Sequence, residues 1–192
     1  MNTPAHLIFG AAFFGRADRA WTTAAAIAGG LVPDLSLYLL AGGSIFLMGI
    51  PPETVFGQMY FSPGWQAIFA VDNSIPLWGL MLALALLVRS APAVAFGASG
   101  LLHVVIDFLV HHDDARRHLW PLSDYVFVSP VSYWDPAHHG LIVAPLEVAI
   151  CLALSVVLWR RFPGRTARAL IVLAMLAEAS PAVMFGLMFA DT

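Results

Sequence analysis

One stretch of the chain combines an apolar helix with side chains that bind divalent metals. It runs from Leu101 to His118 and reads LLHVVIDFLVHHDDARRH. His103 and Asp107 are four residues apart, so a helix places them on one face, one turn apart. If the helix continues, three more residues fall on the same stripe: His111, Asp114 and His118. Neutral imidazole nitrogens and carboxylate oxygens suit zinc and similar ions, so the stretch predicts a metal site.

The same residues also fit a plainer interpretation, in which the helix ends in a hydrated loop where His and Asp are ordinary. Two features favour a site: five such residues share one stripe, and the stripe begins inside an apolar run. A catalytic site would also need a proton acceptor near the metal. The candidates for this role are His111, His112, Asp114 and His118. Of these residues and Asp113, one or two are expected either to supply the acceptor or to complete the metal shell, and the others to be solvated.

The composition predicts an all-α, polytopic membrane protein. Of the 192 residues, 60% are hydrophobic and 11% are charged, whereas soluble domains carry about a quarter charged residues. The chain contains no Lys, and its nine basic residues are all Arg, which argues against a basic nucleic-acid-binding surface. Cys151 is the single cysteine and lies in an apolar run, so neither an internal disulfide nor thiol chemistry is expected.

Apolar runs predict one membrane domain, residues 1–192, with about five to six transmembrane helices. The runs cover residues 4–15, 21–41, 74–88, 92–111, 139–159 and 167–189. A span needs about 20 apolar residues, so the first run is either a short crossing or a half-inserted helix. Pro33 is expected to interrupt the second run. Residues 51–73 are typical of an interfacial segment or a short re-entrant pair, and 112–138 form a long, proline-broken loop.

The arginines predict which way the protein faces. Successive spans cross the membrane in opposite directions, and this places seven arginines on one side: Arg16, Arg19, Arg89, Arg160, Arg161, Arg165 and Arg168. Arg116 and Arg117 fall on the other side. The positive-inside rule makes the seven-arginine side cytoplasmic. Both termini and the 112–138 loop then face outward, into the periplasm if the membrane is a bacterial inner membrane.

Ionisable residues from several predicted spans lie at similar depths. At ~1.5 Å of rise per residue they lie about 15 to 25 Å above the cytoplasmic ends of their spans. The set is His6, Asp34, Asp72, His103, Asp107, Glu147 and Glu178. A charge near the bilayer centre costs on the order of several kcal/mol unless it is paired or coordinated. We therefore expect one polar pocket that opens outward under the 112–138 loop. Pairwise hydrogen bonds between helices without a metal, such as Asp34 with His6, are the alternative.

The expected cofactor is a divalent metal, zinc being the best match. The candidate ligands, in order of preference, are His103, Asp107, His6, Asp34, Asp72, Glu147 and His139. Asp72 can instead cap the helix that follows it, and Glu147 can be a buried acid that pairs two helices. Glu178 is expected to be structural. The N-terminal run lacks a positive region and is short, so we expect no cleaved signal peptide and a retained His6.

The order of these motifs resembles the YdjM-like membrane-bound metal-dependent hydrolases. The matching residues are His6 in an apolar helix, Leu31-Val32-Pro33-Asp34, Leu102-His103 with Asp107 four residues later, and Trp120-Pro121. That family is similar in turn to zinc-dependent phospholipase C and the S1/P1 nucleases, which bind metal through a His-x-x-x-Asp helix, an N-terminal His and a separate Asp. The resemblance implies a metal site and hydrolytic chemistry. The family's His-rich stretch between the second and third motifs is absent here, and Asp72 stands near its place.

The sequence predicts a membrane-embedded, metal-dependent hydrolase of a phosphoester or lipid-like substrate at the outer face. An outward pocket roofed by an aromatic loop suits a membrane lipid or an amphiphilic small molecule. One alternative is a transporter or metal-handling protein that uses the pocket as a passage. Another is a non-catalytic membrane assembly protein. A passage needs polar residues through to the cytoplasmic side, and the inner halves of the spans are apolar (residues 24–26, 80–87 and 152–158), which favours a blind pocket.

Overall fold

The chain folds as a bundle of helices, and the all-α prediction is confirmed. The computed structural model describes residues 1–189, with side chains to residue 181, and contains no strand in that range. The helices are α1 (Thr3–Phe14), α2 (Ala20–Gly42), α3 (Pro52–Thr54), α4 (Pro63–Asp72), α5 (Ile75–Leu87), α6 (Ala91–Val110), α7 (Gly140–Arg161) and α8 (Arg165–Phe189). Short π-helical turns follow α2 (Gly43–Leu47) and α3 (Val55–Met59), and a 3-10 turn (Pro136–His138) precedes α7.

Within the described residues, four helical segments are long and apolar enough to span a membrane. They are Ala20–Leu47, Pro63–Leu87, Ala91–Val110 and Gly140–Arg161. This is the architecture of an integral membrane protein, as the composition predicts. Helix α1 has 12 residues and therefore a length of about 18 Å, shorter than a hydrocarbon core of about 30 Å. The predicted crossing over 167–189 extends past the residues whose side chains are described.

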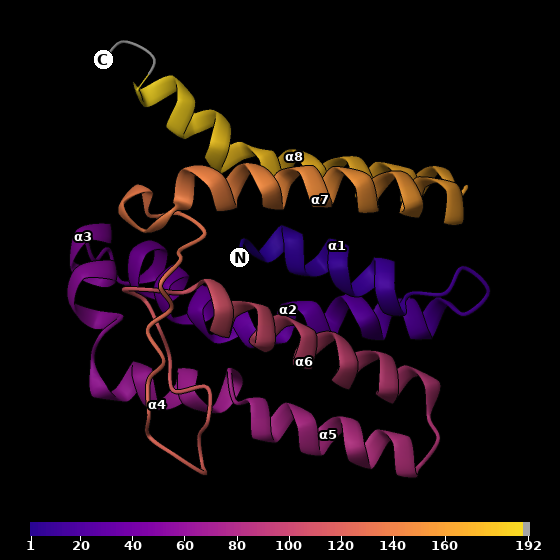
Figure 1. The fold of residues 1–192 in the computed structure, drawn as a ribbon, viewed down its shortest axis with the longest axis horizontal. Helices are drawn as coiled ribbons and strands as arrows, with labels where there is room; N and C mark the ends of the chain where they lie inside the picture. The colour runs from indigo at the N-terminus through magenta and orange to yellow at the C-terminus, as the bar shows by residue number, and fades with distance from the viewer. Residues whose placement is uncertain (190–192) are drawn as a thin grey trace.

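The short helix α1 lies inside the bundle. Figure 1 shows α7 and α8 on one side of it and α2 and α6 on the other, while the chain between α6 and α7 crosses one end of the bundle. Helix α1 packs against α2, α6, α7 and α8. Its Ala5, Ile8 and Ala11 form a buried cluster with Cys151 and Leu158 of α7. A helix that is apolar on all faces suits such an enclosed position, and His6 is carried into the interior with it.

Glycines allow α1, α2 and α6 to approach closely. A Cβ atom on Gly29 would lie 2.2 Å from the Phe96 carbonyl oxygen of α6. A Cβ atom on Gly30 would lie 2.7 Å from the His6 carbonyl oxygen of α1. Small residues at such crossings let helix backbones come together, as in other membrane bundles. The three helices therefore meet near the ionisable residues that were predicted to lie at similar depths in the membrane.

The predicted interruption of the second run at Pro33 is wrong, because α2 continues through it to Gly42. Proline removes one helix donor, and polar side chains from neighbouring elements contact carbonyl groups of the same turn. His103 Nδ1 of α6 donates to the Gly30 carbonyl at 2.8 Å, and Asn73 Nδ2 donates to the Pro33 carbonyl at 3.4 Å. Polar side chains from other helices thus satisfy the backbone near the proline, as they do in membrane proteins generally.

The span predicted over 74–88 is longer in the structure, because α4 continues it towards the loop end of the bundle. The two helices meet at Ser74, whose hydroxyl accepts a hydrogen bond from the Leu77 N–H at 3.0 Å and caps α5. The same hydroxyl donates to the Trp120 carbonyl of the long loop. Ser74 rather than Asp72 is therefore the cap, and it also fastens the loop to the bundle.

Helix α6 ends at Val110, within one residue of the span predicted over 92–111, so the stripe does not continue as a helix to His118. His111 has an extended backbone (φ −103°, ψ 123°) and ends α6. The loop that follows returns across this end of the bundle. The Ser129 N–H donates to the His111 carbonyl at 3.0 Å, and the Tyr133 N–H donates to the Val110 carbonyl at 3.0 Å. The loop is thus pinned directly above the end of α6.

Candidate metal centre

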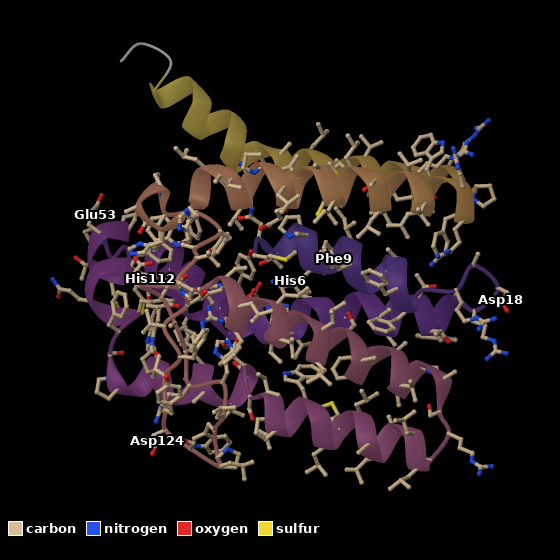
Figure 2. The ribbon with its side chains drawn as sticks, in the orientation of Figure 1. His6, Phe9, Asp18, Glu53, His112 and Asp124 are labelled. Atoms are coloured by element: carbon tan, nitrogen blue, oxygen red, sulfur yellow. The ribbon has the colours of Figure 1, made fainter. Side chains whose placement is uncertain are left out.

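Three buried side chains from α1 and α6 form the centre of the polar cluster. His6, His103 and Asp107 offer ligand atoms that all lie within 4.8 Å of one another. His6 Nε2 is 2.9 Å from Asp107 Oδ1, and His103 Nε2 is 3.2 Å from Asp107 Oδ2. The two imidazole rings stack at 3.4 Å between centroids. Figure 2 shows His6 deep between the helices rather than at their ends.

His103 presents a lone pair to two carboxylates. Its Nδ1 lies 2.8 Å from the Gly30 carbonyl oxygen, which can only accept, so Nδ1 carries the hydrogen. In a neutral imidazole Nε2 is then an acceptor. It faces Asp107 Oδ2 at 3.2 Å and Asp34 Oδ1 at 3.6 Å, and it makes no hydrogen bond to any residue the structure describes. An acceptor facing two anionic oxygens requires a cation between them, either a proton or a metal ion.

Asp34 of α2 joins the cluster from the side. Its Oδ2 accepts a hydrogen bond from the Thr3 hydroxyl at 2.5 Å, and the Tyr38 hydroxyl donates to Thr3 at 2.8 Å. Its Oδ1 faces both His103 and, at 3.9 Å, Arg116 Nη1. The carboxylate is therefore held in orientation by one oxygen while the other points at the centre, which is the support that metal ligands receive in known sites.

His111 and Asp114 form a second pair beside the centre. His111 Nε2 is 3.4 Å from Asp107 Oδ1, and His111 Nδ1 is 2.9 Å from Asp114 Oδ2. Although burial alone would lower the pKa of His111, the carboxylates of Asp107 and Asp114 raise it above its ordinary value. Burial would raise the pKa of Asp114, but His111 lowers it overall. The Met1 ammonium also lies here, 2.8 Å from Asp107 Oδ1.

The charges of the clustered side chains leave a deficit of positive charge. The carboxylates of Asp34, Asp107 and Asp114 share this region with one guanidinium, that of Arg116. The Met1 ammonium, 2.8 Å from Asp107 Oδ1, adds a second positive charge. With neutral histidines, these five groups carry one excess negative charge. Buried charges are stable only when they are paired or coordinated. A bound cation would offset this charge, so the donor set fits a metal ion in ligand chemistry and in the sign of its charge.

A cavity of about 400 Å³ opens beside this cluster. Asp34, His111, Asp114 and Arg116 supply its polar wall. Its apolar and aromatic wall is formed by Leu37, Tyr38, Phe56, Tyr60, Phe61, Tyr133 and Trp134. The predicted pocket under the long loop is therefore present, and it joins charged groups to an aromatic rim.

Four predicted site residues lie outside the cluster. Asp72 ends α4, and its carbonyl oxygen accepts a hydrogen bond from Trp78 Nε1 at 2.7 Å. His112 stacks on His138 and bonds the Ser129 carbonyl, and Figure 2 shows it nearer the loop end than His6. His118 packs edge-on against Phe108, and burial lowers its pKa to about 4. His139 is exposed and precedes α7 with a left-handed backbone (φ 66°).

Glu147 lies at the edge of the cluster, where its carboxylate contacts the backbone of Asn2. Its Oε1 accepts from the Asn2 N–H at 2.8 Å, and its carboxyl group faces that of Glu178 on α8. Both acids are buried. Glu147 therefore fits the interpretation of a buried acid that pairs helices.

Sequence reasoning missed Arg116 as a member of the site. From the sequence, this residue served only to assign the sides of the membrane, yet its side chain is buried, at 4% exposure. Its Nη1 donates to Asn73 Oδ1 at 2.8 Å, its Nε donates to the Tyr60 hydroxyl at 3.3 Å, and its guanidinium lies over the Phe69 ring. Burial would lower the pKa of Arg116, but Tyr60 and Asp34 raise it, so the residue is a fixed positive charge. Its spacing from the other motifs carries no periodic signal.

Comparison of the chain with protein-family models, with curated proteins and with solved structures gives no match. The function must therefore be argued from the site itself.

Proposed function

We propose that this chain is a membrane-embedded, metal-dependent hydrolase that acts on a phosphoester or lipid-like substrate at the outer face of the membrane. One observation carries the proposal: His103 Nε2, whose ring partner Nδ1 is bonded to the Gly30 carbonyl, faces the carboxylates of Asp107 and Asp34 inside a bundle of membrane-type helices. A relation to the YdjM-like hydrolases, which the motif order resembles, is part of the same proposal.

His6, His103 and Asp107 would hold the metal, with Asp34 as a further oxygen donor. Two imidazoles and one or two carboxylates form a donor set that suits zinc. When bound, such an ion supplies Lewis-acid chemistry, in that it polarises a phosphoryl oxygen and acidifies a water. His103 is hydrogen-bonded to the Gly30 carbonyl and Asp34 to the Thr3 hydroxyl. These hydrogen bonds hold both metal-ligand side chains in position without the metal.

His111 and Asp114 would handle the proton. Asp114 Oδ2 lies 2.9 Å from His111 Nδ1 and thereby favours a hydrogen on Nδ1. His111 Nε2 is then the atom that accepts a proton from the attacking water. Both residues line the cavity, so the proton acceptor stands between the metal donors and the space for a substrate. This is the geometric requirement for a general base.

The cavity favours an amphiphilic substrate. Arg116 offers a fixed positive charge on the wall, suited to the phosphoryl oxygens of a phosphoester. Phe56, Phe61 and Trp134 supply an apolar rim for the rest of the molecule. A lipid headgroup with its attached chain has this combination of charge and apolar surface.

The distribution of arginines supports a site on the outer side of the membrane. Arg16, Arg89 and Arg161 line one cavity at the far end of the bundle, and the positive-inside rule assigns that end to the cytoplasm. The metal centre is nearer the other end, beneath the 112–138 loop. In a bacterial inner membrane, the site would therefore open to the periplasm.

The two alternatives have less support. A passage for a transported ion would have to continue below the centre, but Ile8, Ala12, Cys151 and Leu158 fill the space along α1 with apolar atoms. In a non-catalytic assembly protein, the polar cluster would serve only stability. Catalytic turnover of a substrate would distinguish an enzyme from such a protein.

The experiment is a hydrolysis assay on the full chain in detergent micelles that contain a phospholipid or a phosphodiester dye. Zinc-loaded protein should release product, and the double variant His103→Ala/Asp107→Ala should lose at least about a thousandfold in rate, the scale of metal-assisted charge stabilisation. His139→Gln removes an exposed histidine outside the centre and should retain full rate. Equal rates in the double variant and the wild type would contradict the proposal.

A further inference from the structure

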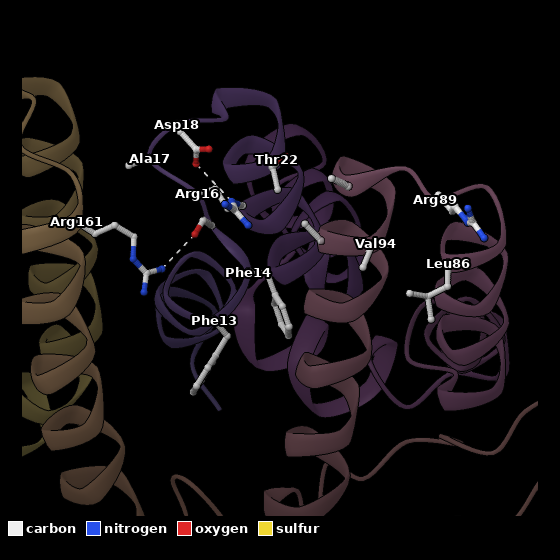
Figure 3. Close-up of a pocket in the computed structure, with 13 residues that line it drawn as sticks. Phe13, Phe14, Arg16, Ala17, Asp18, Thr22, Leu86, Arg89, Val94 and Arg161 are labelled. Carbon is white, nitrogen blue, oxygen red and sulfur yellow. Dashed lines mark hydrogen bonds and ion pairs between the residues drawn. The ribbon is translucent and has the colours of Figure 1, made fainter.

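A second cavity lies at the opposite end of the bundle from the metal centre. It has a volume of about 860 Å³ and sits where α1 ends and α5 turns into α6. Its walls include the apolar side chains of Phe14, Leu86 and Val94 (Figure 3). Its polar lining residues come from two turns, from the start of α2 and from the end of α7: Arg16, Asp18, Thr22, Arg89 and Arg161. The cavity thus combines an apolar wall with a basic rim.

The rim carries more positive than negative charge. Three arginines stand against Asp18, whose carboxylate lies 3.4 Å from Arg16 Nε. Arg161 Nη1 donates to the carbonyl oxygens of Ala12 and Gly15 at 2.7 and 3.1 Å, which fixes its guanidinium in the wall. In Figure 3, Arg161 and Arg89 flank the cavity, with Arg16 between them. The arrangement complements an anion at the mouth.

Arg89 has a backbone conformation that favours glycine. Its φ of 53° lies in the left-handed region, where a side chain costs free energy that glycine does not. Helices commonly end with a residue in this conformation, most often glycine. Here the residue after the C-cap of α5 is an arginine that lines the cavity.

We infer that this cavity binds an anionic glycerophospholipid from the leaflet on the arginine-rich side. The lipid phosphate would interact with Arg16 and Arg89, because guanidinium groups bind phosphate oxygens with paired hydrogen bonds. An acyl chain would lie against Phe14, Leu86 and Val94. Basic pockets between membrane helices attract anionic headgroups in this way, and the apolar wall favours a lipid over a free anion. This site is independent of the metal centre.

The test compares the full chain in nanodiscs of phosphatidylcholine with the chain in nanodiscs that also contain phosphatidylglycerol. The anionic lipid should raise the unfolding temperature and remain bound in native mass spectra. The double variant Arg16→Gln/Arg89→Gly should weaken retention of phosphatidylglycerol by about fivefold for each arginine removed. Glycine suits the left-handed backbone at position 89, and the unfolding temperature of the double variant in phosphatidylcholine alone checks that it folds as the wild type does.

The matched control is Arg165→Gln, which removes an exposed arginine at the same end of the bundle but outside the cavity lining. It should bind phosphatidylglycerol as the wild type does. Three results would overturn the inference: equal stabilisation by both lipid compositions, equal losses in the control and the double variant, or full stabilisation by glycerol phosphate in solution.

Discussion

His103 Nε2 and Asp107 Oδ2 face each other at 3.2 Å across one turn of α6. The Gly30 carbonyl accepts a hydrogen bond from His103 Nδ1. In the neutral ring, Nε2 is then an acceptor like Asp107 Oδ2, and a cation between the two atoms would make their approach favourable. The helix backbone fixes the spacing, and α2 fixes the tautomer. The arrangement therefore provides a place for a metal and depends on packing between helices distant in sequence.

His111→Gln tests the assignment of the proton acceptor. Glutamine keeps a polar side chain in the cavity but cannot accept the proton, so hydrolysis should fall by about 10² to 10⁴. The metal should remain bound, because His6, His103 and Asp107 are untouched. Rate and metal content are measured on the same preparation. An unchanged rate would remove His111 from the chemistry, and loss of the metal would make it a ligand instead.

Gly29→Ala tests whether the crossing of α2 and α6 positions the donors. The added Cβ would lie 2.2 Å from the Phe96 carbonyl oxygen, so the helices must separate, at a cost of about 1 to 3 kcal/mol in unfolding free energy. Metal affinity should fall as well, because Asp34 moves with α2 and His103 with α6. Both quantities are measurable by unfolding and by zinc titration.

The matched control is Gly43→Ala, at the end of the same helical run. Gly43 has helical backbone angles (φ −60°, ψ −45°), and its Cβ would meet no atom within 4 Å among the described residues. This variant should keep wild-type metal affinity. A similar effect of both substitutions would show that the crossing is not the cause.

Because His118 is buried with a lowered pKa, we expect the protein to lose stability in mild acid. Burial holds the pKa of this side chain at about 4 in the folded protein, against about 6.5 in an unfolded chain. Between these values the unfolded state binds a proton that the folded state does not, so stability falls as the pH drops from about 6.5 towards 4. The full effect is about 3 kcal/mol.

Unfolding of the wild type and of His118→Asn across this pH range measures the effect. Asparagine retains an N–H for the Arg116 carbonyl, which His118 Nδ1 now contacts at 3.0 Å, and it does not titrate. The difference between the two profiles should slope through the window. Parallel profiles would show that His118 is not held neutral by the fold.

The helix period and the depth of each charge predicted much of the metal centre. The spacing of His103 and Asp107 placed them on one face of α6, and counting residues along the spans put His6 and Asp34 at the same level. The structure brings these four side chains together. Their convergence could be predicted because an isolated charge inside the membrane is energetically costly, so charged residues at similar depths are expected to pair.

The remainder depends on loop paths and caps, which carry no periodic signal. The span was expected to end near residue 111, but residue spacing could not show that a turn after α6 brings His111 and Asp114 towards Asp107. The same holds for Arg116, which the loop folds back against Asp34. Conversely, His139 was a candidate ligand, but it immediately precedes α7 and its side chain is exposed.

The most direct test of the account is the metal content of the purified full chain after chelation, reloading with zinc and removal of free ions. Elemental analysis should find about one tightly held divalent ion per chain in the wild type and in the His139→Gln control. It should find almost none in His103→Ala/Asp107→Ala. A folded wild-type protein that retains no metal, or a double variant that retains as much as the wild type, would contradict the central claim.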